Sequence, residues 1–206
     1  IRDRSNIIKF LFAAVASGTN SSHVFFRNAG GSNERGRITA DNSDNFILSN
    51  GTSGTERLRI DTNGIITQAS QCGFIARLTS NANNVTGNST AYTITNAFTE
   101  YFDTNSDFNA SNATFTAPVA GVYLFTVICT SSSNQSATYQ FLGKNGSRHR
   151  DLFEGDSYTT NSERNASALL NLAVNDVVDF RNGGVFAVQG SGNHNYYSAF
   201  MGILLG

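Results

Sequence analysis

The sequence has one proline, two cysteines and no tryptophan in 206 residues, and only 14% of its residues are charged. Two cysteines are too few for a disulfide framework, and neither belongs to a CxxC pair suited to metal binding or redox chemistry. The net charge is −1 and no basic patch stands out. The electrostatic footprint of nucleic-acid binding is therefore missing, and polyanionic or membrane-surface partners are disfavoured too.

The sequence also lacks an apolar run long enough to cross a bilayer, which needs about 20 residues. The segment 7–17 follows Arg2 and Arg4 and imitates a short signal peptide, but Lys9 interrupts its apolar stretch. We favour a buried strand or a short linker helix here over a signal peptide, and we predict no membrane insertion. Because the chain begins with Ile1 rather than Met, we expect it to be a piece of something longer.

Signatures of catalysis and of metal binding are missing as well. There is no Gly-x-Ser-x-Gly sequence, and the glycines are scattered through turns instead of forming a phosphate loop. The densest charge cluster, 148–156, contains His149, but its arginines would repel a cation; we interpret it as a solvated loop, with a receptor contact or an inter-subunit salt bridge as the alternative. The segment 41–45 begins like a calcium loop, but Phe46 stands where the sharp turn requires Gly. We predict no enzymatic activity, no cofactor and no metal ion.

Asn, Ser, Thr and Gly are abundant, which is typical of short strands and turns. In residues 1–68, apolar pieces of three to five residues alternate with turn signals such as Asn50-Gly51 and Asp61-Thr62-Asn63-Gly64. Such short pieces bury too little apolar surface to offset the chain entropy by themselves. We therefore predict a β-rich shaft over 1–68 in which identical chains complete one another's cores.

Longer strand patterns begin near Gln71 and continue to the end of the chain, at a spacing that indicates an all-β sandwich or jelly roll over 69–206. The strand that follows Pro118, Val122 to Cys129, is apolar on both faces, and 198–205 is nearly so. A two-layer sandwich covers one face of each sheet, and no helix is available to cover the other. A subunit interface would cover it, so we predict an oligomer.

The segment 69–206 resembles the globular head domain of complement component one q, a member of the tumour-necrosis-factor-like jelly rolls. The matching segments are Phe74-Ile75-Ala76, Phe102-Asp103, 114–125, Leu142, Asn145-Gly146, 168–172, 175–178 and 198–205. One departure is Asn175, where the family usually has Gly; Asn tolerates the left-handed backbone conformation, so we expect the turn to be kept. The resemblance implies a ten-strand-type jelly roll, a homotrimer on a thin stalk, and strands that hold Cys72 and Cys129 too far apart to bridge.

A second resemblance concerns 46–64, which contains Gly54-Thr55-Glu56-Arg57-Leu58-Arg59-Ile60 followed by an Asp-x-x-Gly turn. It is similar to a unit that precedes terminal head domains in fibre and spike proteins of bacteriophages. This similarity implies a virion appendage, located at the particle surface and extracellular when it acts.

These patterns together predict a viral, in particular bacteriophage, trimeric fibre or spike whose head binds a host-surface receptor, for which a glycan is one candidate. The alternatives are a trimeric capsid-decorating or baseplate-associated protein, and a secreted complement-like lectin. For the core strands and the trimer interface we name Tyr123, Phe125, Val127, Phe200, Ile203 and Leu205. The candidate receptor-contact loops carry Ser157, Tyr158, Asn193, His194, Asn195 and Tyr196.

Overall fold

The fold is built from strands and turns, in agreement with the predicted all-β class. The computed structural model describes residues 11–14, 22–27, 30, 33–79, 82–83, 92–93, 98–130, 135–159, 161–184, 187–188 and 198–206. It divides into two compact units, Ile1–Ser70 and Gln71–Gly206, whereas the sequence analysis placed the boundary after residue 68. No helix in the part of the chain that the structure describes has the length and apolar character needed to span a membrane.

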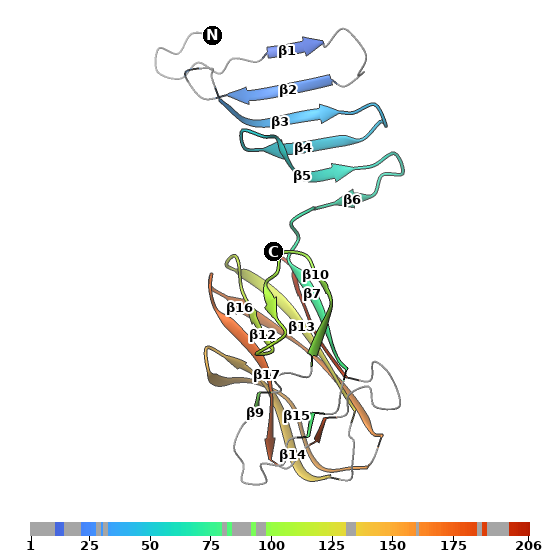
Figure 1. Cartoon of the computed structure of the whole chain (residues 1–206), viewed down its shortest axis with the longest axis vertical. Helices are drawn as coiled ribbons and strands as arrows, with labels where there is room; N and C mark the ends of the chain where they lie inside the picture. The colour runs from blue at the N-terminus through green and yellow to red at the C-terminus, as the bar shows by residue number, and fades with distance from the viewer. Residues whose placement is uncertain are drawn as a thin grey trace. The chain divides into compact units, whose positions relative to one another are not determined.

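The N-terminal unit is one antiparallel sheet whose six strands pair in the order in which they follow along the chain (Figure 1). The strands are β1 (Leu11–Ala14), β2 (Ser22–Arg27), β3 (Glu34–Ala40), β4 (Phe46–Asn50), β5 (Thr55–Ile60) and β6 (Ile66–Thr67). The stretch interpreted as a strand or a linker helix contributes β1. The described residues of this unit form a single layer, so within the described ranges neither face of the sheet packs against a second sheet of the unit.

The C-terminal unit, which we call the head, contains two larger sheets. The first has the order β10-β7-β19-β13-β16. Its strands are β7 (Gly73–Leu78), β10 (Phe98–Asp103), β13 (Gly121–Thr130), β16 (Glu163–Leu172) and β19 (Ala199–Leu204). Since β19 lies between β7 and β13, Cys72 and Cys129 belong to opposite sides of the last strand, as the resemblance implied, and both thiols are free.

The second sheet has the order β11-β12-β17-β14-β15, and β9 also pairs with β17. Its strands are β9 (Tyr92–Thr93), β11 (Phe108–Asn109), β12 (Thr114–Thr116), β14 (Gln135–Lys144), β15 (Ser147–Tyr158) and β17 (Val177–Gly184). A short pair, β8 (Ala82–Asn83) and β18 (Ala187–Val188), completes the head. Pro118 lies between β12 and β13, outside any strand, where its missing N–H costs no ladder hydrogen bond.

Aromatic side chains dominate the core of the head. Phe74 stacks on Phe108 and Phe115, with ring centroids 4.7 and 5.2 Å away, and meets Phe200 edge-on at 5.1 Å. Offset and edge-on pairs of this kind add about 0.5–1.5 kcal/mol each beyond the burial of their surface. Tyr123 is also fully buried, and its hydroxyl donates to the carbonyl oxygen of Val119 at 2.8 Å. The phenylalanine-rich sequence thus provides one continuous core between the two sheets.

The turn before β17 confirms the expectation for Asn175. This residue has a φ of 67°, in the left-handed region that Asn tolerates. The carboxylate of Asp176 next to it accepts hydrogen bonds from Asn145 Nδ2 at 2.7 Å and from the backbone N–H of Ala173 at 2.8 Å, and it pairs with Lys144 Nζ at 2.7 Å. The hydrogen bonds of Lys144 and Asn145 lower the pKa of Asp176 from 3.8 to about 2.

The charge cluster 148–156 is not the solvated loop that the sequence suggested. It lies within β15, which forms the edge of the second sheet and pairs with β14. An edge strand tolerates charged side chains because one side of it is open to water, and such charges discourage pairing with other chains. Arg148 illustrates this: its guanidinium bonds Asp151 at 2.6 Å and lies over the rings of Tyr139 and Phe141.

The Asp176 cluster predicts a specific pH dependence of stability. Because the pKa of Asp176 is lower in the folded chain, its ionised form stabilises the fold above about pH 4, and this stabilisation disappears as the pH falls toward 2. Asp176→Asn should lower the midpoint of thermal unfolding near neutral pH, and the difference from the unsubstituted chain should vanish near pH 2. The control Asp151→Asn removes an exposed ion pair with Arg148 and should change the midpoint little. An equal loss for Asp176→Asn at both pH values would contradict this account.

Candidate functional site

The first sheet of the head has one face against the core and one face turned away from it. In β13 the burial alternates, so that Tyr123, Phe125 and Val127 point inward while the residues between them point outward. The pairing with β16 and β19 carries this alternation across the sheet. The outward-pointing residues are therefore fixed by the register, and we call the surface they form the outer face.

Two rows of residues that lie opposite one another on neighbouring strands make up the centre of the outer face. The first row contains Phe102, Ile75, Met201, Thr126 and Ser167. The second row contains Gly73, Ile203, Leu124 and Leu169. Residues of the two rows line a hollow of about 220 Å³, together with Phe74 and Gly202. The side chains that line it are apolar apart from that of Thr126, so the hollow is suited to apolar groups.

Exposed apolar residues gather on the strands of this sheet. Of the eight large exposed hydrophobic residues in the described part of the head, six belong to these strands or to the position directly after β19: Tyr101, Phe102, Val122, Leu169, Ile203 and Leu205. Monomeric soluble proteins seldom expose a continuous apolar surface of this kind, whereas interaction sites do. The geometry therefore marks the outer face as the candidate functional site of the head.

A few polar groups border the outer face. The guanidinium of Arg77 lies 4.2 Å from the ring centroid of Tyr101, which is a favourable cation–π distance. The hydroxyls of Thr126 and Ser167 are hydrogen-bonded to each other at 2.7 Å. Because the two hydroxyls are already paired, covering them with apolar atoms would not leave an unsatisfied hydrogen-bonding group.

The structure divides the residues named for the core strands and the interface into two groups. Tyr123, Phe125, Val127 and Phe200 are fully buried inside the sandwich, so they are core residues and offer no surface to a partner. Two residues stand outside the core: Ile203 with 44% of its surface exposed and Leu205 with 56%. Of the six named residues, these two are the ones available for a contact between subunits.

Of the candidate receptor-contact residues, the structure describes the first group, Ser157 and Tyr158, but not the second. Ser157 and Tyr158 form the last two positions of β15, where they pair with Ser136 and Gln135, so they belong to a strand and not to a loop. The turn that follows is closed by Ser162, whose backbone N–H donates to the carbonyl oxygen of Thr159 at 3.0 Å. The second group, Asn193, His194, Asn195 and Tyr196, lies outside the described residues.

Neither cysteine offers a reactive site. Cys72 and Cys129 have about 2% and 1% of their surface exposed. Burial raises the pKa of the Cys72 thiol to about 12, with a further contribution from Asp107, and burial raises the pKa of Cys129 as well. Both side chains therefore remain thiols, which are poor nucleophiles. Within the described ranges, no three His, Cys, Asp or Glu side chains come close enough together to hold a metal ion.

Most residues of the outer face were not predicted from the sequence, including Ile75, Tyr101, Phe102, Leu124 and Met201. In β13 the apolar residues occupy both alternating positions, so periodicity alone does not show which set faces the core. The pairing with β19 decides the question, because Gly202 lies opposite Phe125 and leaves room for its ring: a Cβ on Gly202 would approach that ring to 2.8 Å. Gly202, within the last strand, was the signal in the sequence that could have shown which face of β13 points toward the core.

Comparison with known proteins places the head in a family. The model of the C1q domain family matches residues 74–205, which is more than half of the chain, and the chain belongs to this family. Domains of this family and of the related tumour-necrosis-factor fold are typically trimeric and bind receptors or other ligands, and they are generally not enzymes. No curated protein sequence matches the chain.

Solved structures of the same fold class are similar to the head. Murine APRIL matches with a TM-score of 0.50 and 11% identity, over 66% of this chain and 100% of its own. The globular domain of zebrafish complement 1qA matches with a TM-score of 0.46 and 18% identity, over 66% and 98% of the two chains. Eiger TNF from S. frugiperda matches with a TM-score of 0.43 and 13% identity, over 66% and 93%. At 11% identity, the similarity to APRIL supports the jelly-roll fold alone.

Proposed function

We propose that this member of the C1q domain family is the C-terminal part of a trimeric viral fibre or spike, in particular of a bacteriophage, and that its head binds a receptor on the host surface. Two observations carry the proposal. The described strands of the N-terminal unit form one layer, and the next unit along the chain is a head whose outer face is apolar and not covered by any described element. Both features require partner chains, and an elongated trimeric appendage supplies partners for both.

In this proposal, the outer face is the contact between three copies of the head. Trimers are typical of the family, and the hollow between Ile203, Leu124 and Phe102 would be filled by apolar groups of a neighbouring copy. Complete burial of a Leu, Ile or Phe side chain contributes about 1.5–3 kcal/mol. Because every copy presents the same residues, each of them contributes three times in a symmetric trimer.

The viral and receptor-binding parts of the proposal rest on further observations. The segment 46–64 is similar to a unit of phage appendages, and it forms β4, β5 and the turns that join them to their neighbours. With the outer face used for assembly, recognition is left to segments elsewhere on the head, where Ser157, Tyr158 and 193–196 remain our candidates. Their Asn, Ser and Tyr side chains offer hydrogen-bonding groups and aromatic surface suited to a polar or glycan ligand.

Ile203→Asp tests the assembly. The isolated head should tolerate this change because Ile203 is 44% exposed, but in a trimer it would bury a carboxylate, at a cost of several kcal/mol for each copy. We expect the variant to remain folded by circular dichroism and to have the mass of a single 22.1 kDa chain by light scattering, while the unsubstituted chain has three times that mass. The control Val119→Asp alters a residue with 47% of its surface exposed that is not in any strand, and it should remain trimeric. A trimeric Ile203→Asp variant would contradict the assignment of the outer face.

A cryo-electron reconstruction of a particle that carries the chain tests the proposed role. We expect the heads at the free distal end of a fibre or spike, where they can reach a host receptor. Heads packed against capsid or baseplate subunits would overturn the adhesion role in favour of the structural alternative. Secretion of the chain by a cell, with no particle that contains it, would overturn the viral role in favour of a complement-like lectin.

A further inference from the structure

Two segments of the N-terminal sheet share the sequence pattern Glu-Arg-x-Arg-Ile. Glu34-Arg35-Gly36-Arg37-Ile38 on β3 is followed 22 positions later, from position 34 to position 56, by Glu56-Arg57-Leu58-Arg59-Ile60 on β5. In both segments the glutamate binds the arginine three residues further on, at 2.6 Å in the first and at 2.5 Å in the second. The sequence repeat is therefore also a repeat of side-chain contacts.

The turns that follow the two segments repeat as well. Asp41 Oδ1 accepts the backbone N–H groups of Ser43 and Asn45 at 2.9 and 3.0 Å. Asp61 Oδ1 accepts the N–H groups of the residues two and four positions further along, both at 2.8 Å. Each aspartate also bonds through its backbone to the residue four positions on, which closes the hairpin. The sheet consequently contains two copies of one module, a strand with a Glu–Arg pair followed by an aspartate-closed turn.

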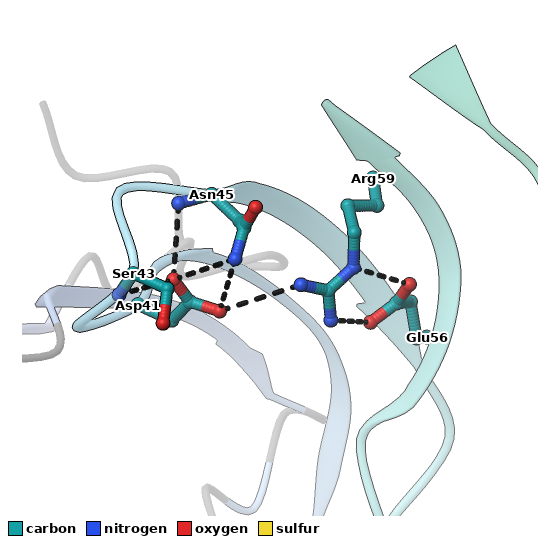
Figure 2. A network of polar contacts seen from close by, with 5 residues as sticks. All are labelled: Asp41, Ser43, Asn45, Glu56 and Arg59. Atoms are coloured by element: carbon teal, nitrogen blue, oxygen red, sulfur yellow. Dashed lines mark hydrogen bonds and ion pairs between the residues drawn. The ribbon is translucent and has the colours of Figure 1, made fainter. Parts of the chain in front are cut away.

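The Glu–Arg pairs lie on one face of the sheet, which we call the charged face. Figure 2 shows Arg59 between Glu56 and Asp41, so that one guanidinium joins β5 to the turn after β3. Hydrogen bonding to Arg59 lowers the pKa of Glu56. In the described part of the unit, the two most buried side chains are Thr39 and Ile47, which lie opposite each other, and Ile47 lies opposite Arg59. The charged face therefore satisfies its own polar groups and covers its own apolar ones.

The opposite face carries two apolar rows, and we call it the apolar face. The first row contains Val24, Ile38, Leu48 and Leu58, and the second contains Ala40, Phe46, Ile60 and Ile66. The exposed fraction is 36% for Leu48, 44% for Phe46 and 62% for Ile66. In the part of the unit that the structure describes, no second layer covers these rows, and a large part of their apolar surface meets water in the single chain.

The repeat restricts what can cover the apolar face. Ile38 and Ile60 occupy the same place in the two modules, so a partner has to present matching apolar groups at the same spacing. Another copy of this chain presents apolar groups at that spacing because it contains the same two modules. Ser70 is followed directly by the head at Gln71, so trimerisation of the heads would also hold three of these sheets together at a high effective concentration.

We propose that the apolar face of the N-terminal sheet packs against the same sheet in two further copies of this chain, with the charged face turned outward to water. This inference rests on the proposed trimer and adds to it the surface by which the shaft assembles. The Glu–Arg pairs, each within one strand, then lie on the outside of the shaft, where Arg59 also joins β5 to Asp41 in the turn after β3.

Nitroxide labels on neighbouring residues of one strand test the proposal in the full chain. Leu48→Cys places the label on the apolar face and Ser49→Cys places it on the charged face of β4, one residue away. Ile66→Cys and Thr67→Cys form a second matched pair on β6, where both side chains are exposed and substitution leaves the packing of the single chain intact. The buried thiols of Cys72 and Cys129 should not be labelled, and the unsubstituted chain measures that background.

We expect pulsed dipolar spectroscopy to give shorter label-to-label distances at 48 and 66 than at 49 and 67, and we expect dilution with unlabelled chain during refolding to abolish the coupling. Distances that are equal within each pair, or shorter on the charged face, would overturn the proposal. Loss of coupling at all four positions in a sample with a trimer mass would overturn the shaft contact and leave the head trimer standing. A single-chain mass without coupling would contradict both.

Discussion

An antiparallel β-sheet has two faces, and apolar side chains on both of them must be kept from water. In the head, the second sheet covers one face of the first, through a core of stacked phenylalanines around Phe74 and Phe200. The other face carries Ile75, Leu124, Met201 and Ile203, and no described element of the head covers it. The same constraint is more severe for the N-terminal sheet, because the described residues of its unit form no second layer. The proposed assembly of the head and of the N-terminal sheet follows from these uncovered faces.

In both units, charged side chains find partners of opposite charge or hydrogen-bonding partners within the single chain. In the N-terminal sheet, Arg59 is held by Glu56 and Asp41, and in the head Asp176 is held by Lys144 and Asn145. These groups are paired before any partner arrives, so assembly does not have to desolvate an unpaired charge on these surfaces. The apolar surfaces are what remains to be covered, and we therefore propose that the chain associates with further copies of itself.

The sequence predicted the fold class and most of the strands because hydrophobic patterns and turn residues are local signals. Asn175 was predicted correctly, since the left-handed conformation is a property of the residue itself. The direction of each side chain in β13 was not predictable, because apolar residues occupy both alternating positions and the pairing with β19 decides between them. The strand β15 was missed because its charges are typical of a loop, whereas its place at a sheet edge depends on the whole fold. The repeated module was recognised from the structure, because equivalent residues make the same hydrogen bonds in both copies. In the sequence, the repeat is interrupted where Gly36 and Leu58 differ.

We infer that one copy of this chain cannot bury its own apolar surface and that three copies can. Sedimentation equilibrium of the unsubstituted full chain over a wide range of concentrations tests this directly. We expect a mass three times that of the 22.1 kDa chain, maintained on dilution. A stable, folded monomer that stays soluble across that range would contradict it.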